Sequence, residues 1–222
     1  MKLILLGLPG AGKGTQALVI AERNGLLHIS TGDMFREAAA EGTDLGKQAG
    51  DFMSRGELVP DEVTIGMLLE RIEKPDAAAG FMLDGFPRTI AQAEALDAAL
   101  AARDEAIDRV MYIEVPEADL MARLTGRWTC PNCSSIFHEL FSAPKQSGSC
   151  DDCGTALTQR EDDQPATVKQ RLDVNRESTE ALATFYGNAS KLARIDGTGE
   201  PSQVTDCLFE ALADVPSGSR KE

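Results

Sequence analysis

Short, largely apolar runs alternate with longer amphipathic segments along most of the chain. Each run ends at a Gly or Pro and spans only four to six residues, which favours strands over helices. Because the first run is nearly all apolar and leads into a Gly-rich turn, we interpret the runs as buried parallel strands. A further short strand is expected around His28 and Ile29. The four runs are KLILL (2–6), FMLD (81–84), VMYIEV (110–115) and ARID (193–196).

The segments between these runs show helical periodicity. A helix is expected from about Lys13, and Asp61 opens another with an acidic first turn. Ala93, Leu96 and Leu100 recur at helical spacing. Strands that alternate with helices predict an α/β fold, a doubly wound, five-stranded parallel sheet. Ligands of such sheets bind at the carboxyl ends of the strands.

Two segments interrupt this alternation. Residues 31–60 look helical, contain several glycines and lack a strand, whereas residues 128–163 are rich in Cys, Ser, Gly and Asp. We expect both to be insertions into one core domain. The chain is therefore expected to divide into three parts. These are a core of residues 1–29, 61–125 and 164–222, a helical insertion of residues 30–60 and a small module of residues 126–163. The polar tail PSGSRKE is expected to be frayed.

Composition excludes several classes of protein. No apolar run approaches the roughly 20 residues that cross a bilayer, and the apolar N-terminal run is too short for a secretory signal. A net charge of -14 disfavours nucleic acids and anionic membranes as partners. We therefore expect a soluble, cytoplasmic protein in which any anionic ligand is held by a local cluster of cationic side chains.

The first candidate site is GLPGAGKGT, from Gly7 to Thr15. It follows a strand and precedes a helix, so its backbone N–H groups and Lys13 are placed to bind phosphates, as in a P-loop. Gly14 occupies the position where the P-loop pattern has a hydroxyl residue, and Thr15 comes one residue later. The alternative is a glycine turn that binds no nucleotide, which the flanking strand and helix disfavour.

The second candidate site is LDGFPRT, residues 83–89. Asp84 ends a strand, as does the carboxylate that holds Mg²⁺ or its waters in many phosphoryl-transfer enzymes. Arg88 follows, with Pro87 fixing its approach. Capping of the next helix is the alternative role for Asp84.

The third candidate site is made of cysteines. CPNC (130–133) and CDDC (150–153) are separated by sixteen residues, a spacing typical of a structural zinc site with four thiolates. Disulfides or free thiols are the alternatives, and iron or cobalt also suits such ligands. A module this small is expected to owe its fold to the metal. The remaining cysteine, Cys207, lies among apolar residues and is expected to be a buried core thiol.

These motifs, together with ISTGDMFR (29–36) and Gln92, resemble bacterial adenylate kinases of the long-lid type from residue 1 to about residue 213. The resemblance implies reversible, Mg²⁺-dependent phosphoryl transfer from ATP to AMP giving two ADP, in adenine nucleotide homeostasis, by a monomer. Residues 30–60 would bind AMP and residues 126–163 would form a zinc-containing lid. In this family the nucleotide phosphates and waters hold the metal, which is consistent with Gly14 in place of a hydroxyl residue.

The resemblance also assigns residues to the two nucleotides. The ATP site would contain Gly10, Ala11, Gly12, Lys13, Gly14, Thr15, Arg123, Arg127, Ile136, Phe137 and Gly199. The AMP site would contain Thr31, Arg36, Glu57, Leu58, Val59, Gly85, Phe86, Pro87, Arg88, Gln92, Arg160 and Arg171. The catalytic group would be Lys13, Asp84, Arg88, Arg123, Arg127, Arg160 and Arg171, with the metal ligands Cys130, Cys133, Cys150 and Cys153.

Residue chemistry supports parts of this assignment. Arg123 and Arg127 are four residues apart, so one helical face is expected to present both, and Arg171 follows Pro165 near the start of a long helix. Gln92 carries a donor beside an acceptor, which matches the edge of adenine. The arginines as ordinary surface residues and Gln92 on a helix surface are the alternatives.

Other positions leave the assignment open. Gly199 stands where the family often has a lysine, so only its backbone can contact ATP. Glu57 occupies a place where a neutral or basic residue is expected. Asp33 is a candidate to assist Asp84 in holding the metal. The stretch from Ile136 to His138 suits either contact with adenine or the core of the lid.

Two rival functions are considered. One is a kinase of UMP, CMP or GMP. The other is a zinc-ribbon ATPase that binds nucleic acid, and the low aromatic content and acidic charge of the chain disfavour this second rival.

Overall fold

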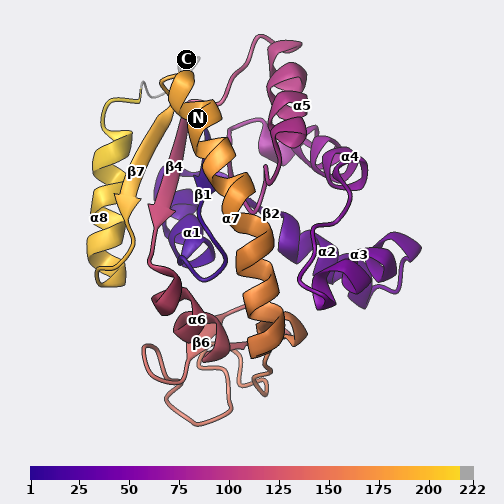
Figure 1. Cartoon of the computed structure of the whole chain (residues 1–222), viewed down its shortest axis with the longest axis vertical. Coiled ribbons are helices and arrows are strands. Elements are labelled where there is room, and N and C mark those ends of the chain that lie inside the picture. Colours follow the sequence, from indigo (N-terminus) through magenta and orange to yellow (C-terminus); the bar gives the residue numbers. More distant parts are fainter. Residues whose placement is uncertain (216–222) are drawn as a thin grey trace.

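The computed structural model describes residues 1–215, so the tail predicted to be frayed lies outside the described residues. Its centre is a five-stranded, fully parallel sheet, as the sequence predicted (Figure 1), and the strands lie in the order β2-β3-β1-β4-β7. The strands are β1 (Lys2–Leu6), β2 (Leu27–Ser30), β3 (Phe81–Asp84), β4 (Arg109–Glu114) and β7 (Leu192–Asp196).

Helices cover both faces of the sheet (Figure 1). In β1, Leu3 and Leu5 pack on one face while Ile4 and Leu6 pack on the other. All four side chains are buried, which explains why this strand is apolar at successive positions instead of alternating. The core helices are α1 (Lys13–Asn24), α4 (Asp61–Ile72), α5 (Ile90–Ala101), α6 (Glu117–Thr125), α7 (Pro165–Asn188) and α8 (Pro201–Leu212), with the short 3₁₀ turns η1 (Pro75–Ala77) and η2 (Glu161–Asp163).

The helical insertion consists of α2 (Thr31–Ala40) and α3 (Asp44–Ser54), which lie beside the core at the right of Figure 1. Thr43 caps α3 by accepting a hydrogen bond from the N–H of Gly46 at 3.0 Å. The two helices pack so closely that a Cβ at Gly46 would lie 2.1 Å from the carbonyl carbon of Ala38. Only glycine fits at this contact.

The small module contains the antiparallel strands β5 (Arg127–Thr129) and β6 (Ile136–His138) and lies at the lower end of Figure 1. Its own core comprises the side chains Cys130, Phe137, Cys150 and Leu157, with Trp128 packed against them. The two chain segments that join this module to the core touch each other. Thr129 forms a β-bridge with Thr158, and Gln159 Nε2 donates a hydrogen bond to the Thr125 carbonyl at 2.6 Å.

Two predictions from the sequence were wrong. Arg127 does not share a helical face with Arg123, because α6 ends at Thr125 and Arg127 belongs to β5. Cys207 is exposed. In α8 the buried face carries Val204 and Leu208, and Cys207 is rotated about 100° from Leu208 around the helix. Among the described residues no helix is long and apolar enough to span a membrane.

The packing of α2 against α3 yields a test with a matched control. Gly46→Ala should lower the free energy of unfolding by about 1–3 kcal/mol, because the new methyl group meets backbone atoms that cannot move aside. Gly50→Ala, in the same helix, places its Cβ where no atom lies within 4 Å and should raise stability by about 0.5–1 kcal/mol. Urea denaturation measures both changes, and equal effects of the two substitutions would contradict the close packing.

Candidate active site

A cavity of about 860 Å³ opens at the carboxyl ends of the strands, between the core, the helical insertion and the small module, which is called the lid from here on. The residues predicted for the two nucleotide sites border this cavity, although they come from all three parts of the chain. Phe86 is the exception among them, because its side chain is buried in the core beneath, and the four clustered cysteines do not border the cavity. The site therefore assembles groups that are up to 189 positions apart in the sequence, from Gly10 to Gly199.

The glycine-rich loop forms one wall of the cavity. Lys13 begins α1, and its Nζ donates hydrogen bonds to the carbonyls of Gly7 at 2.8 Å and Leu8 at 3.1 Å. Gly10 has a φ of 86°, and a Cβ there would lie 2.9 Å from Leu124 Cγ, so the loop needs glycine at this position. No side chain caps the start of α1, so its first N–H groups face the cavity as an anion site.

Asp84 stands beside this wall at the end of β3, in register with Leu5 of β1. Burial alone would raise the pKa of its carboxyl, but the neighbouring His28 imidazole and the charge of Lys13 outweigh burial and hold the pKa below the ordinary value. The His28 Nε2 lies 3.9 Å from Asp84 Oδ2. A Cβ at Gly14 would lie 3.5 Å from the same oxygen. Gly14 thus leaves the space next to the carboxylate free for a cation and its waters.

Guanidinium groups surround the middle of the cavity. Burial and, to a smaller extent, the neighbouring charge of Arg171 lower the pKa of Arg88 to about 10. Burial likewise lowers the pKa of Arg160 to about 10, with Arg36 and Arg127 as repelling neighbours. The groups remain cationic at neutral pH, and nearby carboxylates such as Asp162 offset only part of their mutual repulsion, so an anion bound among them would relieve it further.

Two carboxylates that the sequence analysis overlooked fix part of this cluster. Asp163, fully buried, accepts two hydrogen bonds from Arg127 at 2.8 and 2.5 Å and one from Arg171 at 3.0 Å. Arg171 also donates to the backbone carbonyl of Asp162 at 2.9 Å. Their position two and three residues after Arg160 was the available signal, because buried arginines require nearby acceptors.

The side of the cavity next to α2 carries the other predicted residues. Thr31 Oγ1 donates to the Gly85 carbonyl at 2.9 Å, and Arg88 Nε donates to the same oxygen at 2.8 Å. Arg36 pairs with Asp33, whose carboxylate also lies 4.0 Å from Arg160. Glu57 pairs with Arg55 at 2.9 Å at the exposed rim. The negative charge of Glu57, which the sequence made unexpected at this position, is thus paired with Arg55.

The lid contributes Ile136, Phe137 and His138 to the cavity wall. The last two are also buried in the lid, and the His138 Nδ1 accepts hydrogen bonds from the backbone N–H groups of Leu140 and Phe141 at 3.0 and 3.2 Å. These two side chains are therefore part of the lid interior and also border the cavity, and their contact with adenine stays a prediction.

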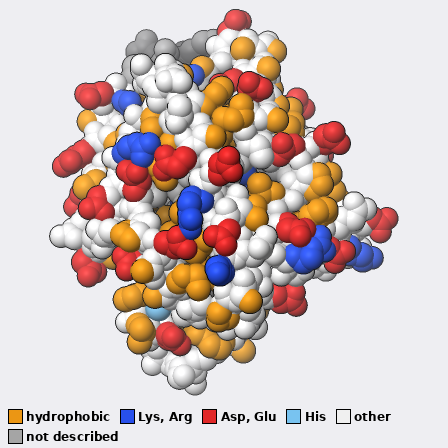
Figure 2. Space-filling model, viewed as in Figure 1, with side chains coloured by type: hydrophobic (Ala, Val, Ile, Leu, Met, Phe, Trp, Pro, Cys, Tyr) orange, Lys and Arg blue, Asp and Glu red, His pale blue; other side chains and the backbone are white. Residues whose placement is uncertain are grey.

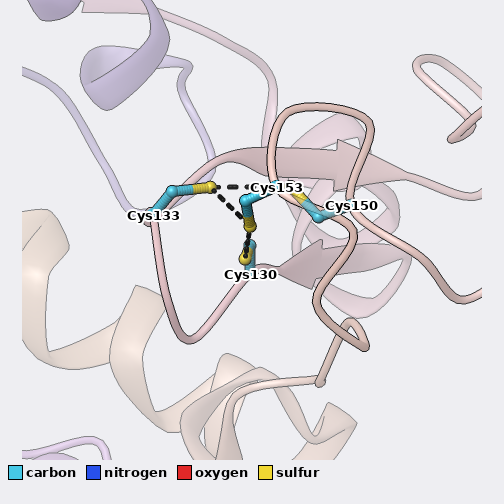
Figure 3. A group of neighbouring side chains, drawn as sticks. All are labelled: Cys130, Cys133, Cys150 and Cys153. Atoms are coloured by element: carbon cyan, nitrogen blue, oxygen red, sulfur yellow. Dashed lines mark hydrogen bonds between the residues drawn. The ribbon is translucent and has the colours of Figure 1, made fainter.

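The cysteines of the lid point toward one another from two loops (Figure 3). Their four Sγ atoms lie within 4.8 Å of one another, with contacts of 3.4, 3.5 and 3.6 Å. A tetrahedral zinc ion with Zn–S distances of about 2.3 Å would place its sulfur ligands about 3.8 Å apart. The sulfurs are free thiols far beyond the disulfide distance of about 2.05 Å. The donor set and its spacing fit a tetrahedral metal ion.

Comparison with known proteins identifies the family. The sequence profile of the family described as adenylate kinase matches residues 5–191. The chain belongs to the adenylate kinase family. The adenylate kinase of Staphylococcus epidermidis is 52% identical to it over 212 residues, which cover 96% of this chain and 99% of that protein. The adenylate kinase of Staphylococcus aureus strain Mu50 is 53% identical over the same length, with the same coverage.

Because Lys13 is buried among other cations, we predict that ligand binding is coupled to proton uptake. Burial lowers the pKa of Lys13 to about 8, with Arg88 and Arg171 adding to the effect and Asp84 opposing it. A bound polyphosphate should raise this pKa again, so binding at pH 9 should take up close to one proton from solution, whereas binding at pH 6.5 should take up almost none.

Calorimetry of ATP binding in buffers of different ionisation enthalpy measures the uptake. Lys13→Met serves as the comparison, because it removes the titrating group. The explanation is wrong if the wild-type protein takes up as few protons at pH 9 as this variant does.

Proposed function

We propose that this protein catalyses the reversible transfer of a phosphoryl group from ATP to AMP, giving two ADP. The observation that carries the proposal is the convergence of two cationic walls on one cavity. Lys13 and the glycine loop form the first wall, and Arg36 and Arg88 belong to the second. A cavity of about 860 Å³ lies at the upper end of the range for small-molecule sites, as expected where two nucleotides are held end to end.

The roles of the residues follow from their places around the cavity. The glycine loop, Lys13, Arg123, Arg127 and Arg160 would bind the ATP phosphates, and Ile136, Phe137 and Gly199 would border its adenine. On the opposite side, Arg36, Arg88 and Arg171 would hold the AMP phosphate. The walls of the AMP pocket would be Thr31, Glu57, Leu58, Val59, Gly85, Pro87 and Gln92, with Phe86 supporting them from the core.

The reaction is an in-line displacement. A phosphate oxygen of AMP attacks the γ-phosphorus of ATP, and the bond from that phosphorus to the β–γ bridging oxygen breaks, leaving ADP. The attacking phosphate oxygen is already an anion, so no side chain has to remove a proton. Catalysis then consists of positioning and of charge stabilisation by the arginines. Asp163 contributes by fixing Arg127 and Arg171 before the substrates arrive.

Metal ions fit two places. Asp84, ionised and next to the glycine loop, would hold Mg²⁺ or its waters, with Asp33 nearby. Bound Mg²⁺ neutralises charge on the transferring phosphates. In the lid, Cys130, Cys133, Cys150 and Cys153 would hold a closed, structural zinc ion.

The two insertions are the parts expected to move. Residues 30–60 would close over AMP and residues 126–163 over ATP, while residues 1–29, 61–125 and 164–222 remain as the core. Closure would exclude water, which otherwise competes with AMP for the phosphoryl group. We further propose that the enzyme is a cytoplasmic monomer that acts on free nucleotides, without nucleic acid or membrane partners.

A kinase of UMP, CMP or GMP is the second candidate. It shares the phosphate-binding groups, so only the base pocket separates the two. Nucleotide competition in a coupled assay of ADP formation decides between them.

The arginine cluster gives the main test of the proposed function. Arg88→Ala should reduce kcat/KM by about 10³-fold or more, because a buried guanidinium that holds the attacking AMP phosphate at the reacting centre contributes at that scale. Arg103→Ala is the matched control, since Arg103 is exposed and pairs with Glu105 away from the cavity. It should keep kcat/KM within twofold. A loss of less than tenfold in Arg88→Ala would count against the assigned role.

The cysteines give a separate test of the lid metal. Elemental analysis should find about one zinc per chain, and Cys133→Ser should lose it and lower the melting temperature, because the lid core consists of few buried side chains. Cys207→Ser, which changes an exposed cysteine in α8, should retain both zinc and stability. Retention of zinc by Cys133→Ser would refute the four-thiolate site.

A further inference from the structure

The side chain of Gln92 is held at both ends by the protein. It is 1% exposed and borders the cavity next to α2. Its Oε1 accepts a hydrogen bond from the backbone N–H of Arg88 at 2.7 Å, and its Nε2 donates one to Asp61 Oδ1 at 2.7 Å. The amide therefore lies between a backbone donor and a carboxylate.

These two partners determine which end of the amide is oxygen and which is nitrogen. A backbone N–H can only donate, and a carboxylate can only accept. If the amide of Gln92 turned over, its NH₂ group would face the N–H of Arg88 and its oxygen would face Asp61. Two buried hydrogen bonds would be lost together, so a single orientation is strongly favoured.

Asp61 is itself held in place. Thr89 Oγ1 donates to Asp61 Oδ2 at 2.8 Å and accepts from the backbone N–H of Gln92 at 3.2 Å. Thr89 is the N-cap of α5, and Asp61 opens α4 at the end of the helical insertion. Both oxygens of the carboxylate are thus engaged by residues of α5 or its cap.

The fixed amide retains capacity for a ligand. A primary amide has two N–H donors and two acceptor positions, and the protein uses one of each. The remaining donor and acceptor match a base edge that offers an amine beside an unprotonated ring nitrogen, which is the edge of adenine. Guanine and hypoxanthine present a carbonyl oxygen and a protonated ring nitrogen there, which would require the opposite orientation of the amide.

We propose that Asp61 is a positioning residue that sets the base specificity of the acceptor site, by holding the Gln92 amide in the orientation that fits adenine. The inference rests on the proposed function, since it assumes that the base of the acceptor nucleotide lies against Gln92. Asp61 does not touch the nucleotide and acts through Gln92.

Asp61→Leu tests the proposal with little change in shape. The new side chain has no hydrogen-bond acceptor for the NH₂ group of Gln92, so one of the two restraints on the amide is removed. IMP is the probe, because it differs from AMP at the positions that Gln92 reads. The ratio of kcat/KM for AMP to that for IMP should fall by about tenfold, mainly through the two KM values. The KM for ATP should stay unchanged.

Glu62→Gln is the matched control. It removes a carboxylate from the adjacent residue of the same helix, but Glu62 is exposed and does not border the cavity. It should leave the AMP to IMP ratio at the wild-type value. A fall of equal size in this variant would overturn the proposal, because general charge loss would then explain the result.

The remaining outcomes separate the inference from the function. A wild-type protein without preference for AMP over IMP would refute adenine recognition at Gln92, and with it the proposed function. A wild-type preference that persists in folded Asp61→Leu, or an equal loss with both acceptors, would overturn the role of Asp61 alone. Thr89→Ala provides a second variant that frees one carboxylate oxygen. It should shift the ratio in the same direction by a smaller factor, and an unchanged ratio there would also count against the proposal.

Discussion

The buried carboxylate of Asp163 is the interaction on which the architecture of the site depends. It lies in the turn η2, where the chain leaves the lid and enters α7, and it binds one arginine from each of these parts. A fully buried carboxylate is costly unless it is paired, and a buried arginine is costly for the same reason. Because Asp163 serves Arg127 and Arg171 together, loss of Asp163 would leave the charge of Arg127 without its carboxylate partner and Arg171 with Asp162 alone.

Positively charged side chains surround the cavity, although the net charge of the chain is strongly negative. Acidic side chains are spread over the face seen in Figure 2 and do not gather in one patch, whereas the guanidinium groups of Arg88 and Arg160 are desolvated around the cavity. Anionic ligands are therefore repelled by the outer surface and attracted at one place. The lowered pKa values of these arginines measure the cost of the arrangement, which a bound polyphosphate would offset.

The sequence predicted the features that depend on neighbours in the chain. The apolar runs identified the central strands, the glycine loop identified one wall of the cavity, and the cysteine spacing identified the cluster in the lid. The predictions from the sequence were wrong where tertiary packing determines the local structure or the exposure of a side chain. Arg127 has helical spacing from Arg123, but Gly126 follows the end of α6 and a strand begins. Cys207 has apolar neighbours, but the face of α8 that meets the core excludes it. The pairing of Gln92 with Asp61 joins residues 31 positions apart, and no local pattern reveals it.

The base of the lid has a consequence for how the lid can move. Its two connections to the core are joined by the bridge between Thr129 and Thr158 and by the hydrogen bond from Gln159 to Thr125. Loop and terminal residues that join a moving part to its core act as its hinge, and here the two joining segments are tied to each other. If the lid closes as proposed, it should therefore rotate about this paired base, along a path that the attachment sets in advance. The lid would then approach a bound nucleotide from the same direction in every catalytic cycle. Substitutions at these paired residues would change that direction without altering any group proposed to bind phosphate.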